Sequence, residues 1–222
     1  MGETIDLTTA DGKRITAYRA SPAGMPRAGL VVLQEIFGVN AHIRAVADGF
    51  AAQGYLVIAP ALFDRVEPGV ELTYQPRDFE KGRDLRGKIP LEETLTDIDA
   101  AVKAAASAGK VGVVGYCWGG TLAFAAAQRL DGIAGVVGYY GAGIASGLGK
   151  PLKVPVELHF GEKDRSIPAA DIEKIRQAFP EIPIYLYPAG HGFNRAGDTD
   201  HEKASADLAR ERTLGFFART VG

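Results

Sequence analysis

The sequence predicts an α/β fold with a mostly parallel sheet of about seven to eight strands flanked by helices. Short apolar runs recur along the chain, as expected for strands buried on both faces. Between them lie segments whose apolar residues recur every three to four positions, as in amphipathic helices. This alternation favours parallel strands joined by crossover helices. The 222 residues, 46% hydrophobic and 23% charged, suit one domain spanning residues 1–222.

Eight segments have the composition of strands. In chain order they are residues 4–9, 13–20, 29–34, 55–59, 110–115, 133–139, 154–160 and 182–187. Asp11-Gly12 joins the first two and is a dipeptide favoured in hairpin turns. The third, Gly-Leu-Val-Val-Leu-Gln, is apolar enough for the middle of a sheet.

Helices are expected after the third strand, from Leu91, after Cys117, around residues 172–179 and from about Asp200. Asn40 can cap the first of them, and Asp200 is expected to cap the last. Residues 61–90 contain Pro68, Pro76 and Pro90 among many charges, so loops and short surface helices are expected there.

Composition and charge exclude several functions. A net charge of −2 gives no sign of a nucleic acid or an anionic membrane as partner. The single cysteine cannot form an internal disulfide, and a cytoplasmic location is the simpler interpretation. The apolar stretch 111–127 contains four glycines, so a buried strand, a turn and a helix explain it better than a membrane span.

The segment Gly115-Tyr116-Cys117-Trp118-Gly119-Gly120 follows a strand and opens a helix. It fits the nucleophile-elbow pattern G-x-S-x-G of the α/β-hydrolase fold, with cysteine in place of serine. The two glycines flanking Cys117 remove the Cβ atoms that would clash in so tight a turn. The helix N-terminus favours a thiolate at Cys117, and the backbone N–H of Trp118 can donate to an oxyanion.

Two other interpretations of this segment are less well supported. A lone cysteine usually fills a gap in a protein core, but the flanking glycines and the strand–turn–helix context favour a nucleophile. A phosphate-binding loop is excluded because no Gly-Lys-Ser or Gly-Lys-Thr follows, and the chain has no G-x-G-x-x-G.

The elbow predicts that an acid and then a histidine follow it along the chain, each just after a later strand. Asp164 follows strand 154–160 and is the candidate acid, with Glu162 as its near rival. His191 follows strand 182–187 between two glycines and is the candidate base.

The other polar groups have simpler explanations. His42 is expected in the first turn of a helix, His159 in a strand of the core, and His201 at the surface. Asp198, Asp200, His201 and Glu202 lie close together but lack the spacing of metal ligands, so no metal site is expected.

A second motif, Gln34-Glu35-Ile36-Phe37-Gly38-Val39-Asn40, follows the third strand, where the Ile36 N–H is the expected second oxyanion donor. A carboxylate such as Glu35 is costly at the end of a buried strand unless it has a partner. Together with the elbow, Gly138-Tyr139-Tyr140-Gly141 and Gly190-His191-Gly192-Phe193, this motif resembles the dienelactone hydrolase family (carboxymethylenebutenolidases) over nearly the whole chain.

The resemblance implies an α/β-hydrolase core without a cap domain and a triad of Cys117, His191 and Asp164. It implies that Glu35 bonds the resting thiol until substrate displaces it. It further implies that Arg195 and a second arginine hold a substrate carboxylate. Arg83 is chosen for that second role, with Arg77 and Arg86 left open, and Phe37 and Tyr140 complete the expected substrate-binding set.

The expected activity is hydrolysis of an ester or lactone through a thioester on cysteine. By resemblance, the substrate is a dienelactone-like ring that opens to a product of the 4-oxo-hexenedioate (maleylacetate) type. Such chemistry needs no cofactor, and the expected partner is the small-molecule substrate, with the protein a monomer or weak homodimer. The alternatives are a broad-specificity carboxylesterase, a non-catalytic binding protein of the same fold and, least supported, a thiol redox protein, which would lack a resolving cysteine.

Overall fold

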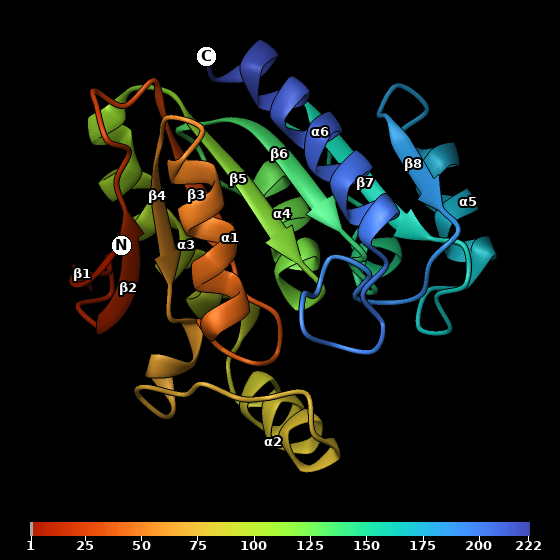
Figure 1. Cartoon of the computed structure of the whole chain (residues 1–222), viewed down its shortest axis with the longest axis horizontal. Helices are drawn as coiled ribbons and strands as arrows, with labels where there is room; N and C mark the ends of the chain where they lie inside the picture. The colour runs from red at the N-terminus through yellow and green to blue at the C-terminus, as the bar shows by residue number, and fades with distance from the viewer. Residues whose placement is uncertain (1) are drawn as a thin grey trace.

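The computed structural model describes residues 2–222, and one sheet of eight strands runs through its centre (Figure 1). The spatial order is β1-β2-β4-β3-β5-β6-β7-β8. The strands are β1 (Glu3–Thr8), β2 (Arg14–Ala20), β3 (Ala28–Leu33), β4 (Tyr55–Pro60), β5 (Val111–Tyr116), β6 (Ile133–Tyr139), β7 (Val156–Gly161) and β8 (Ile184–Tyr187). β2 pairs antiparallel with β1 and β4, and the remaining pairs are parallel. The predicted mostly parallel α/β sheet is confirmed.

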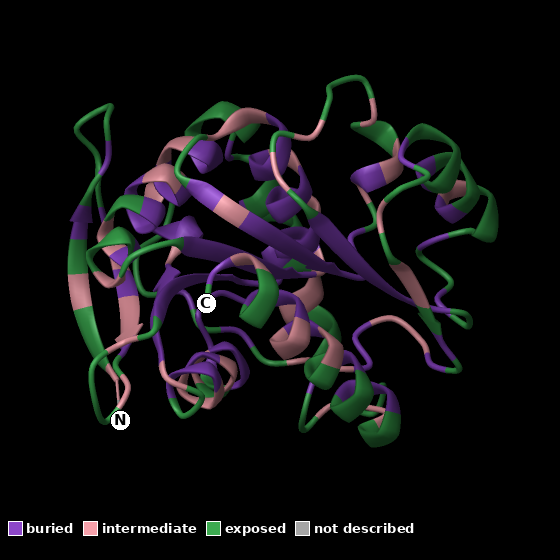
Figure 2. Cartoon of the chain, turned by 90° about the horizontal axis from the view of Figure 1, so that it is seen from above, coloured by how far each residue is buried: buried purple, intermediate pink, exposed green. Residues whose placement is uncertain are grey.

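Helices cover both faces of this sheet (Figure 1). On one face lie α1 (Ala41–Ala51) and α6 (Lys203–Thr220), and on the other lie α3 (Leu91–Ala105) and α4 (Trp118–Arg129). The strands from β3 to β5 are buried at every residue, and Figure 2 shows the sheet as a buried layer between the helices. Two-sided burial explains why these strands are continuous apolar runs.

The predicted helices are present, with differences at their ends. Asn40 caps α1 as expected, because its side chain accepts a hydrogen bond from the Ile43 N–H. The cap of α6 is Glu202 and not Asp200, since the Glu202 carboxylate accepts from Ala204 N and Ser205 N. The structure also contains α5 (Ala169–Ala178) and the short 3₁₀ turns η1 (Leu62–Arg65), η2 (Ala106–Ala108) and η3 (Ile144–Ser146).

Residues 61–90 contain one helix that is longer than the short helices predicted from their proline-rich sequence. Helix α2 spans Pro76–Gly87 and begins at a proline. Proline is well tolerated there, because the first N–H groups of a helix have no intrahelical acceptor. Only Gly82 and Leu85 of α2 are buried. Figure 1 shows this helix beyond the carboxyl ends of the strands, apart from the two helical layers.

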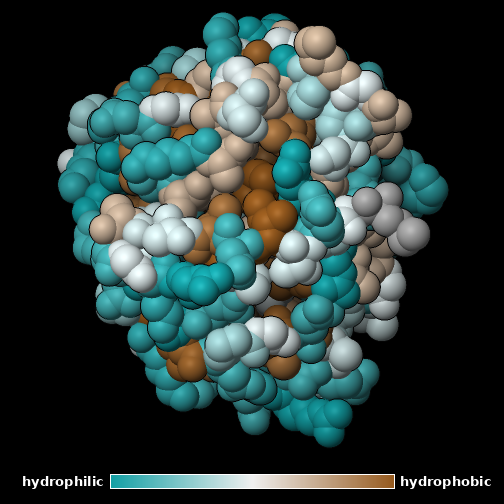
Figure 3. Space-filling model, turned by 90° about the vertical axis from the view of Figure 1, so that its left-hand side faces the viewer, coloured by the Kyte–Doolittle hydropathy of each residue, from teal (hydrophilic) through white to brown (hydrophobic). Residues whose placement is uncertain are grey.

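The surface near β1 is mainly hydrophilic, with hydrophobic side chains visible in a narrow strip (Figure 3). Most residues of β1 are exposed, as suits an edge strand with charged side chains. Among the residues that the structure describes, no helix combines the length and the apolar character needed to cross a membrane. The apolar stretch 111–127 instead divides into β5, the turn at Cys117 and α4.

Candidate active site

Four candidate side chains follow the carboxyl ends of four parallel strands. Glu35 follows β3, Cys117 follows β5, Asp164 follows β7 and His191 follows β8. The order of these strands in the sheet is β3-β5-β6-β7-β8, so their loops meet at one edge. This edge is where ligands bind in open α/β sheets.

Cys117 lies on a strained turn between β5 and α4. Its φ of 53° and ψ of −112° are rarely adopted by a residue with a side chain. The turn is possible because its glycines have no Cβ atom and can therefore approach neighbouring backbone atoms closely. A Cβ on Gly115 would lie 1.9 Å from Gly119 O, and one on Gly119 would lie 2.4 Å from Leu33 O. The glycines that predicted the elbow are therefore sterically required.

Replacing Gly119 with alanine is expected to displace the elbow and lower both stability and activity. The new methyl group would meet rigid backbone oxygens, and such overpacking typically costs about 1–3 kcal/mol. Gly87→Ala is the matched control, since a Cβ there meets nothing within 4 Å. Thermal unfolding and ester hydrolysis of the two variants check this. Equal behaviour of both variants would contradict a steric requirement at Gly119.

Cys117, His191 and Asp164 form a continuous chain of hydrogen bonds. Cys117 Sγ lies 3.2 Å from His191 Nε2, and His191 Nδ1 lies 2.7 Å from Asp164 Oδ2. The other carboxylate oxygen of Asp164 accepts from Ser166 N at 2.8 Å, which fixes the carboxylate. Asp164 is buried, whereas Cys117 and His191 are partly exposed. The three residues selected by chain order are thus in direct contact.

His191 is held in its charged form by its two neighbours. Burial alone would lower the pKa of His191, but hydrogen bonds to Asp164 and to Cys117 outweigh it and raise this pKa to about 10. The imidazole therefore carries a proton across the neutral pH range. A protonated His191 beside the sulfur suits a cysteine nucleophile.

Removing the sulfur is expected to lower the pKa of His191 below its value of about 10, because Cys117 is one of the groups that raise it. An NMR titration of the His191 ring in the wild type and in Cys117→Ala measures this. The buried His159, which contacts neither residue, serves as the internal reference. An identical titration of His191 in both proteins would rule out the coupling.

Two backbone N–H groups lie at the positions expected of oxyanion donors. Trp118 is the first residue of α4, so its N–H has no intrahelical acceptor. Its ring stacks on Phe63 with centroids 5.4 Å apart, which fixes the start of the helix. Ile36 follows β3 and is covered by α2, where a Cβ on Gly82 would lie 2.0 Å from Ile36 O. Helix α2 thus packs directly on this loop.

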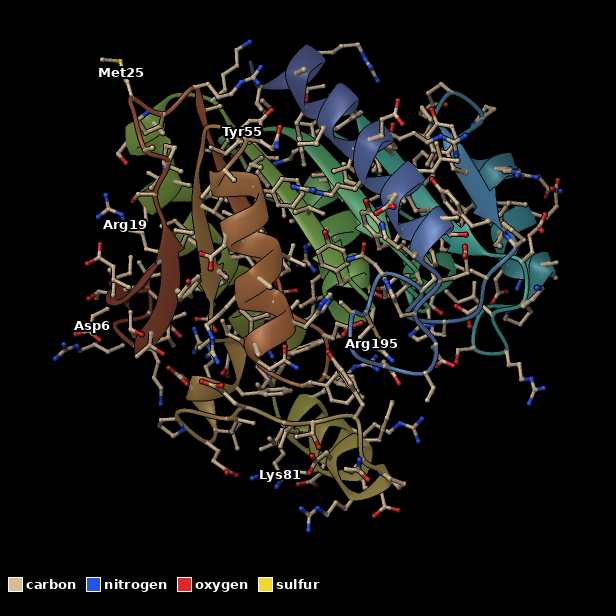
Figure 4. All side chains as sticks on the ribbon, in the orientation of Figure 1. Asp6, Arg19, Met25, Tyr55, Lys81 and Arg195 are labelled. Atoms are coloured by element: carbon tan, nitrogen blue, oxygen red, sulfur yellow. The ribbon has the colours of Figure 1, made fainter. Side chains whose placement is uncertain are left out.

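Glu35 pairs with Arg195 and not with the thiol, which differs from the arrangement implied by the family resemblance. Arg195 Nε lies 3.0 Å from Glu35 Oε2, and Arg195 Nη2 lies 3.1 Å from Glu35 Oε1. Arg195 Nη1 donates to Asp198 Oδ2 at 2.6 Å. Arg195 is only 1% exposed and lies at the carboxyl-end edge of the sheet (Figure 4). Both buried charges are therefore compensated.

The expected substrate-binding aromatic residues are buried. The Phe37 ring packs edge-on against Tyr74 and Phe79, and the Arg195 guanidinium lies 5.2 Å from its centroid. Tyr140 has a φ of 37°, and its ring lies 5.1 Å from the His191 ring. Phe37 thus packs against Arg195 and Tyr140 against His191, and both side chains are fully buried.

The three candidate arginines of the α2 region are exposed. Arg83 and Arg86 have no carboxylate partner among the described residues, and Arg77 lies 3.8 Å from Asp78. None is held toward Cys117 by an ion pair. The structure thus gives no reason to prefer Arg83 over the other two.

The remaining histidines lie outside the triad and contact other parts of the protein. His159 is fully buried beside Glu157, as predicted for a core position, and His42 is buried in the first turn of α1. Among the described residues, His201 forms no hydrogen bond with the triad. Its Nδ1 lies 3.0 Å from Phe193 O.

One residue near the site was not recognised as such from the sequence. The sequence predicts a polar loop around Asp198, whereas in the structure Asp198 accepts a hydrogen bond from the guanidinium of Arg195. Its separation of three positions from an arginine in a glycine-containing loop was the only local signal. Such spacing is common on surfaces and rarely marks a buried pair.

The family model of the dienelactone hydrolase family matches residues 15–221. A carboxymethylenebutenolidase of Pseudomonas putida is 37% identical over 227 residues, which cover 97% of this chain and 96% of the relative. A carboxymethylenebutenolidase of Pseudomonas sp. strain P51 is 34% identical, covering 98% of this chain and 95% of the relative.

Solved structures give the same result. A Klebsiella pneumoniae protein provisionally called a dienelactone hydrolase superposes with a TM-score of 0.85 at 30% identity, covering 99% of both chains. A dienelactone hydrolase-like promiscuous phosphotriesterase from metagenomic libraries has a TM-score of 0.78 but only 17% identity, covering 100% of this chain and 99% of the other. That second likeness concerns the fold alone.

Proposed function

The chain belongs to the dienelactone hydrolase family and is a carboxylic ester hydrolase, and we propose that Cys117 is its nucleophile. The observation that carries the proposal is the hydrogen-bonded chain from Cys117 Sγ to His191 and on to Asp164. Nucleophile and base within hydrogen-bond reach, with the base oriented by a third group, are the geometry of nucleophilic catalysis.

In the first half-reaction, the Cys117 thiolate attacks the substrate carbonyl carbon. Negative charge develops on the carbonyl oxygen, where the N–H groups of Ile36 and Trp118 would stabilise it. The bond from the carbonyl carbon to the leaving oxygen then breaks, and that oxygen takes the proton of His191. The product is a thioester on Cys117. In a lactone, the released hydroxyl or enol stays attached to the acyl group.

In the second half-reaction, water attacks the thioester carbonyl. His191, now neutral, removes a proton from the water, and the carbon–sulfur bond breaks. The acid leaves, and the thiolate and the protonated His191 are restored. Asp164 holds Nδ1 of His191 throughout, which fixes the ring orientation and stabilises its positive charge.

A thiolate leaves readily from a tetrahedral intermediate. The intermediate therefore returns to the reactants unless the substrate's own leaving group is also good. Enol lactones and activated aryl esters meet this condition, whereas amides do not. The relatives' names suggest a dienelactone as substrate, and a broad-specificity carboxylesterase is the second candidate. The second candidate is favoured by Arg195, whose guanidinium already binds two carboxylates.

The test compares kcat/KM for dienelactone, for p-nitrophenyl acetate and for the corresponding p-nitroanilide. Turnover of the lactone or the aryl ester, without cleavage of the anilide, is the expected result. Fast turnover of dienelactone would identify it as the substrate class, and turnover of the aryl ester alone would favour the carboxylesterase. Absence of any hydrolysis would support a non-catalytic protein and contradict the proposal.

A further inference from the structure

Asp198 is the second carboxylate that forms an ion pair with Arg195 beside the active site. The carboxylate of Glu35 binds Nε and Nη2 of Arg195, and that of Asp198 binds Nη1. The side chains of Arg195, Glu35 and Asp198 are 2%, 1% and 11% exposed. Water therefore screens these charges much less than it would at the surface.

The charges of this cluster do not cancel. One guanidinium faces two carboxylates, so the cluster has a net charge of −1 when both are ionised. Burial alone would raise the pKa of Asp198, but its hydrogen bond to Arg195 outweighs burial and lowers this pKa. Asp198 is thus ionised at neutral pH, and three of the five N–H groups of the guanidinium donate to carboxylate oxygens.

The cluster is mechanically joined to the loop of the catalytic histidine. Arg195 N donates to Gly192 O at 2.8 Å, and Gly192 directly follows His191. A Cβ on Gly192 would lie 2.5 Å from Arg195 Cζ, so the guanidinium packs directly on this loop. Tyr140, whose ring lies 5.1 Å from the His191 ring, has a raised pKa, first because it is buried and second because of the charge of Glu35. The charge of the cluster therefore acts at the site of reaction.

We propose that Asp198 selects against substrates that carry a carboxylate: as a second carboxylate on Arg195 it gives the cluster a net negative charge, so the site prefers uncharged esters or lactones. This inference rests on the proposed function and specifies its substrate class. A third carboxylate at Arg195 would be repelled by the two that the guanidinium already binds. The exposed arginines of α2 compensate little for this, because solvent and salt screen their charge.

The test uses two substrates that differ only in charge: mono-4-nitrophenyl adipate and its primary amide, 4-nitrophenyl adipamate. Both release the same leaving group from an acyl chain of the same length. The readout is the ratio of kcat/KM for the adipamate ester to kcat/KM for the adipate ester, with the uncatalysed rates subtracted. For the wild type, this ratio is expected to favour the uncharged ester by about tenfold or more, the scale of one poorly screened charge.

Three variants assign the preference to Asp198. Asp198→Asn removes the charge and is expected to reduce the ratio about tenfold, mainly through a lower KM for the carboxylate. Asp198→Glu keeps the charge and should keep the preference. Asp200→Asn, an exposed aspartate in the same loop, should leave the ratio unchanged. Because each ratio is internal to one protein, a general loss of activity does not alter it.

The outcomes separate this inference from the function on which it rests. A wild type that hydrolyses the adipate as fast as the adipamate would overturn the inference and leave the proposed function intact. An unchanged ratio in Asp198→Asn would overturn the role of Asp198. If the wild type hydrolyses neither ester, the proposed function fails and the inference fails with it.

Discussion

Replacing Cys117 with alanine is expected to reduce kcat/KM for p-nitrophenyl acetate by roughly 10⁴- to 10⁶-fold, the scale seen when a catalytic nucleophile is removed. The thioester cannot form without the sulfur, and His191 alone offers only slow general-base catalysis. Steady-state kinetics of the purified variant, compared with the uncatalysed rate, measures the loss.

The fold should survive this substitution. Cys117 is partly exposed, so truncation by one atom leaves no large cavity. Similar melting temperatures of the two proteins would exclude unfolding as the cause of the lost activity. A variant with activity within tenfold of the wild type would show that another residue is the nucleophile.

Replacing Arg195 with alanine is expected to lower the free energy of unfolding by about 3–5 kcal/mol, as when one partner of a buried ion pair is removed. Glu35 is 1% exposed and would lose both of its charged hydrogen bonds. Asp198 would lose its partner as well, so the upper end of this range is expected. For a chain of this size, the melting temperature should fall by roughly 10 °C.

Two companions of Arg195→Ala test the cause of that loss. Arg83→Ala removes an exposed arginine and should change stability by no more than about 0.5 kcal/mol. Combining Arg195→Met with Glu35→Gln removes both charges of the pair and should recover part of the stability. A drop in stability as large in Arg83→Ala as in Arg195→Ala would show that the buried pair is not responsible.

The sheet was predictable because each buried strand leaves a local record. Two-sided burial forces nearly every residue of β3 and β5 to be apolar, and the apolar residues of α1 and α3 recur at helical spacing. The ends were less predictable. A helix can be capped by any suitable carboxylate near its start, so Glu202 rather than Asp200 caps α6.

Helix α2 was missed for a physical reason. It buries only two residues and carries charges around most of its circumference, so no apolar stripe marks it. Pro76 suggested a loop, yet proline at the first helical position is favourable. A helix held by few core contacts leaves little periodicity to detect.

The contacts of the candidate triad followed from chain order, because the elbow and the sheet topology fix where the acid and base must lie. The partner of Glu35 could not be predicted from chain order. Glu35 and Arg195 are 160 positions apart, and their pairing depends on side-chain orientation in two loops. No local pattern encodes such a choice, and the same is true of the pair formed by Arg195 and Asp198.

The most direct test of the account is to identify the residue that carries the acyl group. The enzyme is mixed with p-nitrophenyl acetate, quenched rapidly in acid and analysed by mass spectrometry of the intact chain and its peptides. The account predicts one acetyl group, labile to hydroxylamine, on the peptide that contains Cys117. An acetyl group on a different residue during turnover, or turnover without an acylated enzyme at any quench time, would contradict it.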